Sequence, residues 1–153
     1  MIGGLRIGMP VLAEHNDLRE DVSLCASLGL DFIELNANLP RCMPERLRTA
    51  DVSAMTVAAG IGLTYHAAED CDPFHFNPLV AAAWRETLRR YISIALDLKV
   101  PVITMHYPDG VYFTLPESRH YLYEQESALH TGALDTWQQL FEEESGGQIL
   151  CCI

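Results

Sequence analysis

Short apolar runs alternate with amphipathic helical stretches along the whole chain, and this alternation limits the fold more than any other feature of the sequence. The apolar runs have the length and β-branched content of buried parallel strands. The pattern predicts five strands, at residues 5–10, 31–36, 61–67, 101–106 and 148–153. The 153 residues, 49% of them hydrophobic, are enough for one domain with its own core. The sequence therefore predicts a single α/β domain over residues 1–153.

Four helices are predicted between these strands. The first has Asn16 or Asp17 as its N-cap, with Glu20 at capping-box distance from Asp17, and ends at Gly29. The others are predicted at residues 45–59, 78–98 and about 118–144, and the last has its best helical spacing from residue 127 onward. Trp84 and Tyr91 are expected to cover the edge of the third helix.

Two of the predicted strands end in a histidine. His66 closes the third strand and His106 closes the fourth. Neighbouring parallel strands lie about 4.8 Å apart, and α/β sheets and barrels carry their sites at the carboxyl edge. We therefore expect the two imidazoles side by side at this edge, where they could bind a metal ion or an anion. The alternative is a structural role, with each imidazole bonded to a neighbouring loop.

Other polar residues surround this predicted site. Glu34 lies near the end of the second strand and either lines the mouth of the site or points to solvent or to an arginine, because buried carboxylates are rare without a partner. His120 and His130 lie on a polar helical stretch and are expected to be exposed rather than functional. The loop after His66 contains a third histidine, His75, and adds three carboxylates that could be ligands or simply solvated: Glu69, Asp70 and Asp72.

The net charge and the cysteine content limit which binding partners and which cellular compartment are expected. The net charge of -11 and the pI near 4.8 argue against a nucleic-acid partner, because such a surface repels phosphate backbones. The five cysteines are odd in number and lack C-x-x-C spacing, which argues against a disulfide framework and a zinc knuckle. No signal peptide and no apolar run of about 18 residues is found. We expect a soluble, cytoplasmic protein that does not enter a membrane.

The chain ends inside its fifth predicted strand, with no polar tail. A closed (β/α)8 barrel needs about 250 residues, so five strands and four helices amount to roughly half a barrel. We therefore expect a truncated barrel. Its open sheet edges could support a homo-oligomer.

Several segments, in their order, resemble the amino-terminal half of the xylose isomerase-like TIM barrels: LGLDFIELNANLP with Glu34, a strand closed by His66, VPVITMHYPDG with His106, and a helix leading into GGQILCCI. This superfamily includes sugar isomerases and epimerases and the AP endonuclease family 2, the endonuclease IV type of abasic-site endonuclease. The resemblance implies an α/β fold of the (β/α)8 TIM barrel type, present as its first half.

The isomerase branch gives the leading functional prediction, a metal-dependent isomerase or epimerase of a sugar, sugar acid or sugar phosphate. The resemblance implies a divalent ion, Mn, Zn or Mg, and a substrate pocket lined by His15, Glu34, His66 and His106. The metal ligands and proton-transfer groups of this branch come mainly from strands five to eight. They are expected beyond Ile153, so the 153-residue chain alone is predicted to be inactive.

The endonuclease branch gives an alternative, a zinc phosphodiesterase acting on abasic DNA, in which His66 and His106 would be metal ligands. The sequence departs from that branch, because AAEDCDPFHFNP follows His66 where the endonucleases carry a H-A-P-Y type run, and PVLAEHND lacks their first-strand signature. A third hypothesis is an inactive or self-associating half-barrel.

Overall fold

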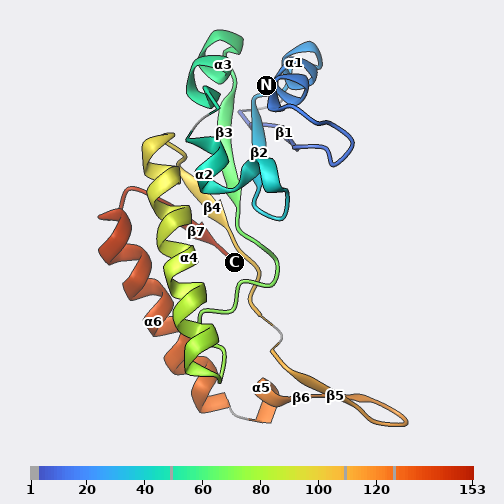
Figure 1. Cartoon of the computed structure of the whole chain (residues 1–153), viewed down its shortest axis with the longest axis vertical. Coiled ribbons are helices and arrows are strands. Elements are labelled where there is room, and N and C mark those ends of the chain that lie inside the picture. The colour runs from blue at the N-terminus through green and yellow to red at the C-terminus, as the bar shows by residue number, and fades with distance from the viewer. Residues whose placement is uncertain (1–3, 49, 109, 126) are drawn as a thin grey trace.

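A parallel sheet of five strands forms the centre of the protein (Figure 1). The computed structural model describes residues 4–48, 50–108, 110–125 and 127–153, and side chains outside residues 125–131. The strands follow the order β1-β2-β3-β4-β7, and every neighbouring pair is parallel. The predicted α/β fold of a partial (β/α) barrel is confirmed. The strands are β1 (Gly8–Pro10), β2 (Phe32–Asn36), β3 (Gly62–His66), β4 (Val102–Thr104) and β7 (Leu150–Cys152).

The two faces of the sheet differ because side chains alternate along each strand. Ile33, Leu35, Leu63, Tyr65 and Ile103 point to one face, where they are buried in the core shared with the helices. We call the opposite face the inner face, because a closed barrel would enclose it. Its side chains are half-buried or exposed: Phe32, Glu34, Asn36, Thr64, His66, Val102, Thr104, Leu150 and Cys152.

Three helices match the predicted pattern closely. Helix α1 (Leu18–Ser27) begins at Asp17, whose carboxylate accepts from the Arg19 amide, while the Glu20 carboxylate accepts from the Asp17 amide, so the capping box is present. Helix α4 (Pro78–Asp97) is capped by Asn77. Helix α6 (Ser127–Ser145) begins where the helical spacing is best. None of the helices, within the described residues, is long and apolar enough to span a membrane.

The predicted helix at residues 45–59 is divided in the structure. A 3-10 turn, η1 (Pro40–Cys42), leads into α2 (Pro44–Leu47), and α3 (Val52–Ala59) follows after a break. Leu47 and Val52 are both buried. Five residues correspond to a rotation of about 140° in a continuous helix, so one helix could not point both side chains into the core. The break resolves this conflict, and Asp51 at the break has a non-helical conformation.

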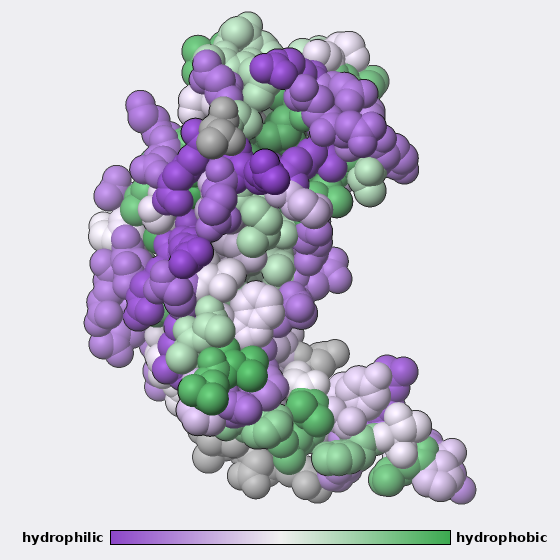
Figure 2. Space-filling view, viewed as in Figure 1, coloured by the Kyte–Doolittle hydropathy of each residue, from purple (hydrophilic) through white to green (hydrophobic). Residues whose placement is uncertain are grey.

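The loop after β4 contains a β-hairpin that the sequence pattern did not predict. Strands β5 (Tyr112–Thr114) and β6 (Arg119–Tyr121) pair antiparallel, and the short helix α5 (Leu122–Gln125) follows. His120 is therefore half-buried in a strand, not exposed on a helix, and the side chain of His130 lies outside the described residues. The hairpin projects from the molecule, and Figure 2 shows apolar side chains near this end. The exposed apolar residues of the hairpin itself include Tyr112, Phe113 and Leu115.

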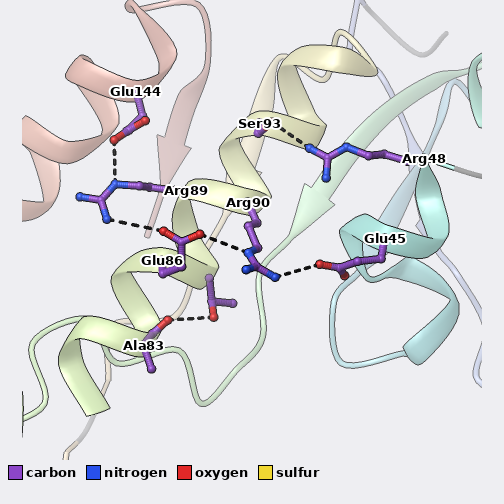
Figure 3. A network of polar contacts seen from close by, with 9 residues as sticks. Glu45, Arg48, Ala83, Glu86, Arg89, Arg90, Ser93 and Glu144 are labelled. Atoms are coloured by element: carbon purple, nitrogen blue, oxygen red, sulfur yellow. Dashed lines mark hydrogen bonds and ion pairs between the residues drawn. The ribbon is translucent and has the colours of Figure 1, made fainter. Parts of the chain in front are cut away.

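Two arginines on α4 connect the outer helices (Figure 3). Arg89 Nε donates to Glu144 Oε1 of α6 at 2.8 Å, and Arg90 Nη1 donates to Glu45 Oε1 of α2 at 3.2 Å. These ion pairs are at the surface and contribute modestly to stability. Beneath them Tyr91 is 1% exposed and packs edge-on against Tyr65, so the prediction that it covers a helix edge is wrong.

Candidate functional site

His66 and His106 lie together at the carboxyl edge of the sheet. Their ring centroids are 4.9 Å apart and their planes are inclined by 50°. His66 is the last residue of β3 and pairs with Thr104, whereas His106 lies two residues beyond the end of β4. The predicted adjacency of the two imidazoles is confirmed, although β4 is shorter than predicted.

A hydrogen bond orients the ring of His66. Its Nδ1 lies 2.8 Å from the carbonyl oxygen of Ala67. Because a carbonyl oxygen only accepts, Nδ1 carries the proton and the neutral ring keeps a lone pair on Nε2. The bond to a neighbouring loop is the one expected for a structural histidine. It also leaves the second nitrogen available to a ligand, since metal-binding and substrate-binding imidazoles are oriented in this way.

Glu34 lies on the inner face, two strands away from Thr104. Thr104 Oγ1 donates to Glu34 Oε2 at 3.3 Å, across the intervening β3. Between them the hydroxyl of Thr64 is buried and has no hydrogen-bond partner among the described residues. Glu34 therefore contacts a threonine rather than an arginine. Thr104 is a site residue that the sequence analysis missed, although it has the same position in the strand alternation as His66.

A cleft of about 530 Å³ begins at His106. The four polar residues of the loop after β3 line it, namely Glu69, Asp70, Asp72 and His75, together with Trp84 and Tyr107. Glu69 and Asp70 are exposed. Asp72 is 6% exposed and accepts from the Tyr123 hydroxyl at 2.9 Å and from the Phe74 amide at 3.1 Å. Asp72 thus has a structural role in the wall of the cleft.

The charge of Asp72 also acts on two tyrosines. Burial, followed by the hydrogen bond to Asp72, raises the pKa of Tyr123. Burial and the nearby Asp72 charge raise the pKa of Tyr107 as well. Both phenols therefore remain protonated donors at neutral pH.

His15 lies in the loop after β1, in a polar cluster of its own. Its Nδ1 is 2.8 Å from Oδ1 of Asp21, a residue of α1 that is fully buried. The Leu12 amide donates to the same oxygen at 2.9 Å, and Arg41 Nη2 lies 3.6 Å from Asp21 Oδ2. Among the described residues, the hydrogen bonds of His15 are made to Asp21 and Leu12, within this cluster. Asp21 was missed from the sequence, where it resembles any acidic residue in the first turn of a helix.

The residues present do not form a complete metal site. Among the described residues, no group of three or more His, Cys, Asp or Glu side chains is placed to hold one metal ion. His66 and His106 could supply two imidazole nitrogens, whereas zinc sites generally use three or four protein ligands. The described donors therefore do not by themselves fit the divalent ion that the resemblance implies.

No protein-family model matches the sequence, and neither does any curated protein. Solved structures do match. A D-psicose 3-epimerase in the presence of D-fructose is 18% identical with a TM-score of 0.70, over 97% of this chain and 52% of that protein. The 3-keto-D-glucoside 4-epimerase of E. coli is 14% identical with a TM-score of 0.72, over 96% and 54%. A candidate xylose isomerase of Rhodospirillum rubrum is 16% identical with a TM-score of 0.68, over 95% and 52%.

The chain thus spans about half the length of these proteins. At identities below one fifth the likeness establishes the fold, and it agrees with the five parallel strands and the helices that cover one face of the sheet. The chain therefore has the fold of about half of a (β/α)8 TIM barrel, the fold it shares with these proteins.

Proposed function

We propose that this chain forms the substrate-binding half of an isomerase or epimerase that acts on a sugar, a sugar acid or a sugar phosphate. The observation that carries the proposal is the imidazole pair, His66 and His106, at the carboxyl edge of a sheet with this fold. In barrels of this kind the carboxyl edge is where substrates bind. The names of the structural neighbours, which are mainly sugar epimerases, support the substrate class.

The polar groups on the inner face suit a polyhydroxy ligand. In the proposed complex, His66 Nε2 accepts a hydrogen bond from a substrate hydroxyl, because its Nδ1 proton is already donated to Ala67. Glu34 accepts from a second hydroxyl, and Thr104 holds its carboxylate in place. Tyr107 and Trp84 at the cleft offer apolar ring surface to the carbon skeleton of a sugar.

The proposed function includes a divalent ion, Mn, Zn or Mg, although the described residues do not supply a complete set of ligands for it. When bound, such an ion would stabilise negative charge on a substrate oxygen. The described residues hold no three-ligand cluster for this ion, although His66 and His106 could supply two of its ligands.

The test is an activity screen of the intact gene product against ketoses, aldoses and their acids and phosphates, with Mn, Zn, Mg or chelator. We expect metal-dependent turnover, and a loss of at least about tenfold in kcat/KM for His106→Ala and for Glu34→Gln. The matched control is His120→Ala in the β5–β6 hairpin, which should retain activity. Absence of turnover across the whole panel would contradict the proposal.

A second candidate is an endonuclease IV-like zinc phosphodiesterase acting on abasic DNA. The adjacency of His66 and His106 favours it, because two imidazoles this close could share one zinc ion. The carboxylates of Glu69 and Asp70 beside His106 oppose it, since they repel a phosphate backbone. Cleavage of abasic-site DNA that is lost in His106→Ala would establish this candidate in place of the first.

A non-enzymatic role as a self-associating half-barrel is the remaining hypothesis. The partly exposed inner face supports it, because apolar residues such as Phe32 and Leu150 would be covered in a dimer. Sedimentation equilibrium of the chain tests it, and a folded monomer at micromolar concentration would rule out obligate pairing.

A further inference from the structure

A second cleft, of about 570 Å³, lies between α1 and the segment formed by η1, α2 and α3. Its walls are the start of α1 with the two residues before it, the turn η1, and residues on both sides of the break between α2 and α3. Among the described residues, none lines both this cleft and the one at His106. The function proposed above gives this second cleft no role.

Three arginines line this cleft, which we call the arginine cleft. Arg19 comes from α1, Arg41 from η1 and Arg46 from α2, so the fold brings together residues from three elements. Two carboxylates, those of Asp17 and Asp51, also line it. Guanidinium groups therefore outnumber carboxylates here, whereas the sequence as a whole has 21 acidic residues against 10 lysines and arginines.

The charge of Arg41 is only partly balanced by protein groups. Its Nη2 donates to the Leu12 carbonyl and lies 3.6 Å from Asp21 Oδ2, which is too far for a hydrogen bond. Its Nε is buried and has no hydrogen-bond partner among the described residues. A buried charged donor without a partner is costly and rare in native structures. An anion in the arginine cleft would supply the counter-charge that Asp21 provides only in part.

The carboxylates of the lining leave room for such an anion. Asp17 Oδ1 accepts from the Arg19 amide and Oδ2 accepts from Arg19 Nη1, both at 2.9 Å. The side chains of Arg19 and Asp17 are 71% and 50% exposed, and ion pairs this exposed are weak. Arg19 can therefore exchange Asp17 for a stronger acceptor at little cost. Asp51 makes no side-chain cap bond to α3, and its charge opposes an anion in the cleft.

We propose that the arginine cleft binds a phosphate group, either as inorganic phosphate or as a small phosphomonoester. The planar guanidinium fork matches phosphate oxygens in pairs, and a phosphate has enough oxygens for more than one arginine. Leu18 and Met55 add apolar surface to the lining, where the carbon part of a phosphomonoester would lie. A polyanion such as a nucleic acid does not fit, because the net charge of the chain is -11. This inference does not rest on the proposed function.

The first experiment measures binding and needs no activity. The intact protein is titrated at low ionic strength with inorganic phosphate and, separately, with glycerol 3-phosphate, by calorimetry and by NMR of the backbone amides. We expect saturable binding with shifts confined to residues 16–19 and 40–55, and the ligand that binds more tightly identifies the source of the phosphate. Absence of saturation by either ligand at millimolar concentration would overturn the proposal.

Variants separate a built site from general attraction of anions. Arg46→Gln and Arg41→Gln should each raise the Kd for phosphate by at least about tenfold. The matched control is Arg119→Gln in the β5–β6 hairpin, which removes the same charge outside the arginine cleft and should leave the Kd unchanged. An equal loss of affinity in the control would overturn the proposal.

A third variant predicts a change in the opposite direction. Asp51→Asn removes a negative charge from the lining and should lower the Kd for phosphate, whereas a higher Kd would contradict the proposal. If Arg41→Gln fails to fold, the exposed positions Arg46 and Asp51 still decide the question. Turnover of sugars has no part in these measurements, so the proposed function and this inference can fail independently.

Discussion

The five cysteines occupy environments that differ sharply in reactivity. Cys25, Cys42 and Cys71 are buried, Cys151 is half-buried and Cys152 is exposed. Burial is the main cause that raises the pKa of Cys42, and it raises that of Cys71 to about 12. Because the thiolate is the reactive form, we expect a thiol reagent at pH 8 to modify Cys152 first and to leave Cys42 and Cys71 unmodified in the folded protein. Mass spectrometry of partial labelling checks this, with the denatured chain as control. Equal rates at Cys71 and Cys152 would contradict it.

Cys71 also predicts how stability depends on pH. Its pKa rises from 9.0 in the unfolded chain to about 12 in the folded protein, so the folded state keeps the proton longer. The contribution is complete below pH 9.0 and is lost as the pH rises toward 12. Between pH 8 and about pH 10.5 we expect wild type to lose about 2 kcal/mol relative to Cys71→Ser, which has no thiol to ionise. Urea unfolding of both proteins measures this difference, and parallel curves would refute the prediction.

A site residue could be predicted from the sequence where its position follows from a local pattern, and could not where it depends on a partner distant in the sequence. His66 and His106 could be placed side by side because each ends one of two consecutive apolar runs. Parallel pairing of the two strands brings their carboxyl ends to the same edge of the sheet. Thr104 could not be identified, because its contact with Glu34 crosses 70 positions of sequence and one intervening strand. Asp21 was equally hidden, because its burial arises from tertiary packing that brings Leu12, His15 and Arg41 against it.

Among the elements, α1 and α3 offer a direct test of helix capping. Asp17 caps α1 with its side chain, whereas Asp51 precedes α3 without a side-chain cap bond. We expect Asp17→Ala to lower the Tm by roughly 2–4 °C and Asp51→Ala to change it little. Asp17→Ser should restore most of the loss. A hydrogen bond from the Arg19 amide lowers the pKa of Asp17, so the difference should disappear as the pH falls below 3.8.

Elements with a local signal were predictable, and elements that depend on tertiary packing were not. The capping box of α1 and the apolar runs of the strands are encoded within a few residues each. The break between α2 and α3 arises because Leu47 and Val52 must both reach the core, which no local pattern reveals. The hairpin of β5 and β6 was missed because its turn residues also suit an irregular loop.

Local unfolding should not be uniform across the molecule. Strands β2 and β3 each have a partner on both sides, whereas β5 and β6 pair only with each other and their side chains are mostly exposed. Isolated two-stranded hairpins are marginally stable. We expect the amides of residues 112–114 and 119–121 to exchange with deuterium well before those of residues 33 and 63. Mass spectrometry of peptides from a time course measures the order, and slower exchange in the hairpin would contradict this view.

The alternation of side chains between the inner face and the core determines where the gene can gain or lose single codons. Glu34, Thr64, His66 and Thr104 share that face only because each occupies the same phase of the two-residue strand period. Loss or gain of one codon between Leu63 and Tyr65 would turn His66 into the core and bring Tyr65 onto the inner face. The same event in the loop at residues 67–77 would leave the phase of every strand unchanged. Heritable insertions and deletions should therefore be tolerated in the loops and eliminated in the strands, and two-codon changes in a strand should be less harmful than single ones.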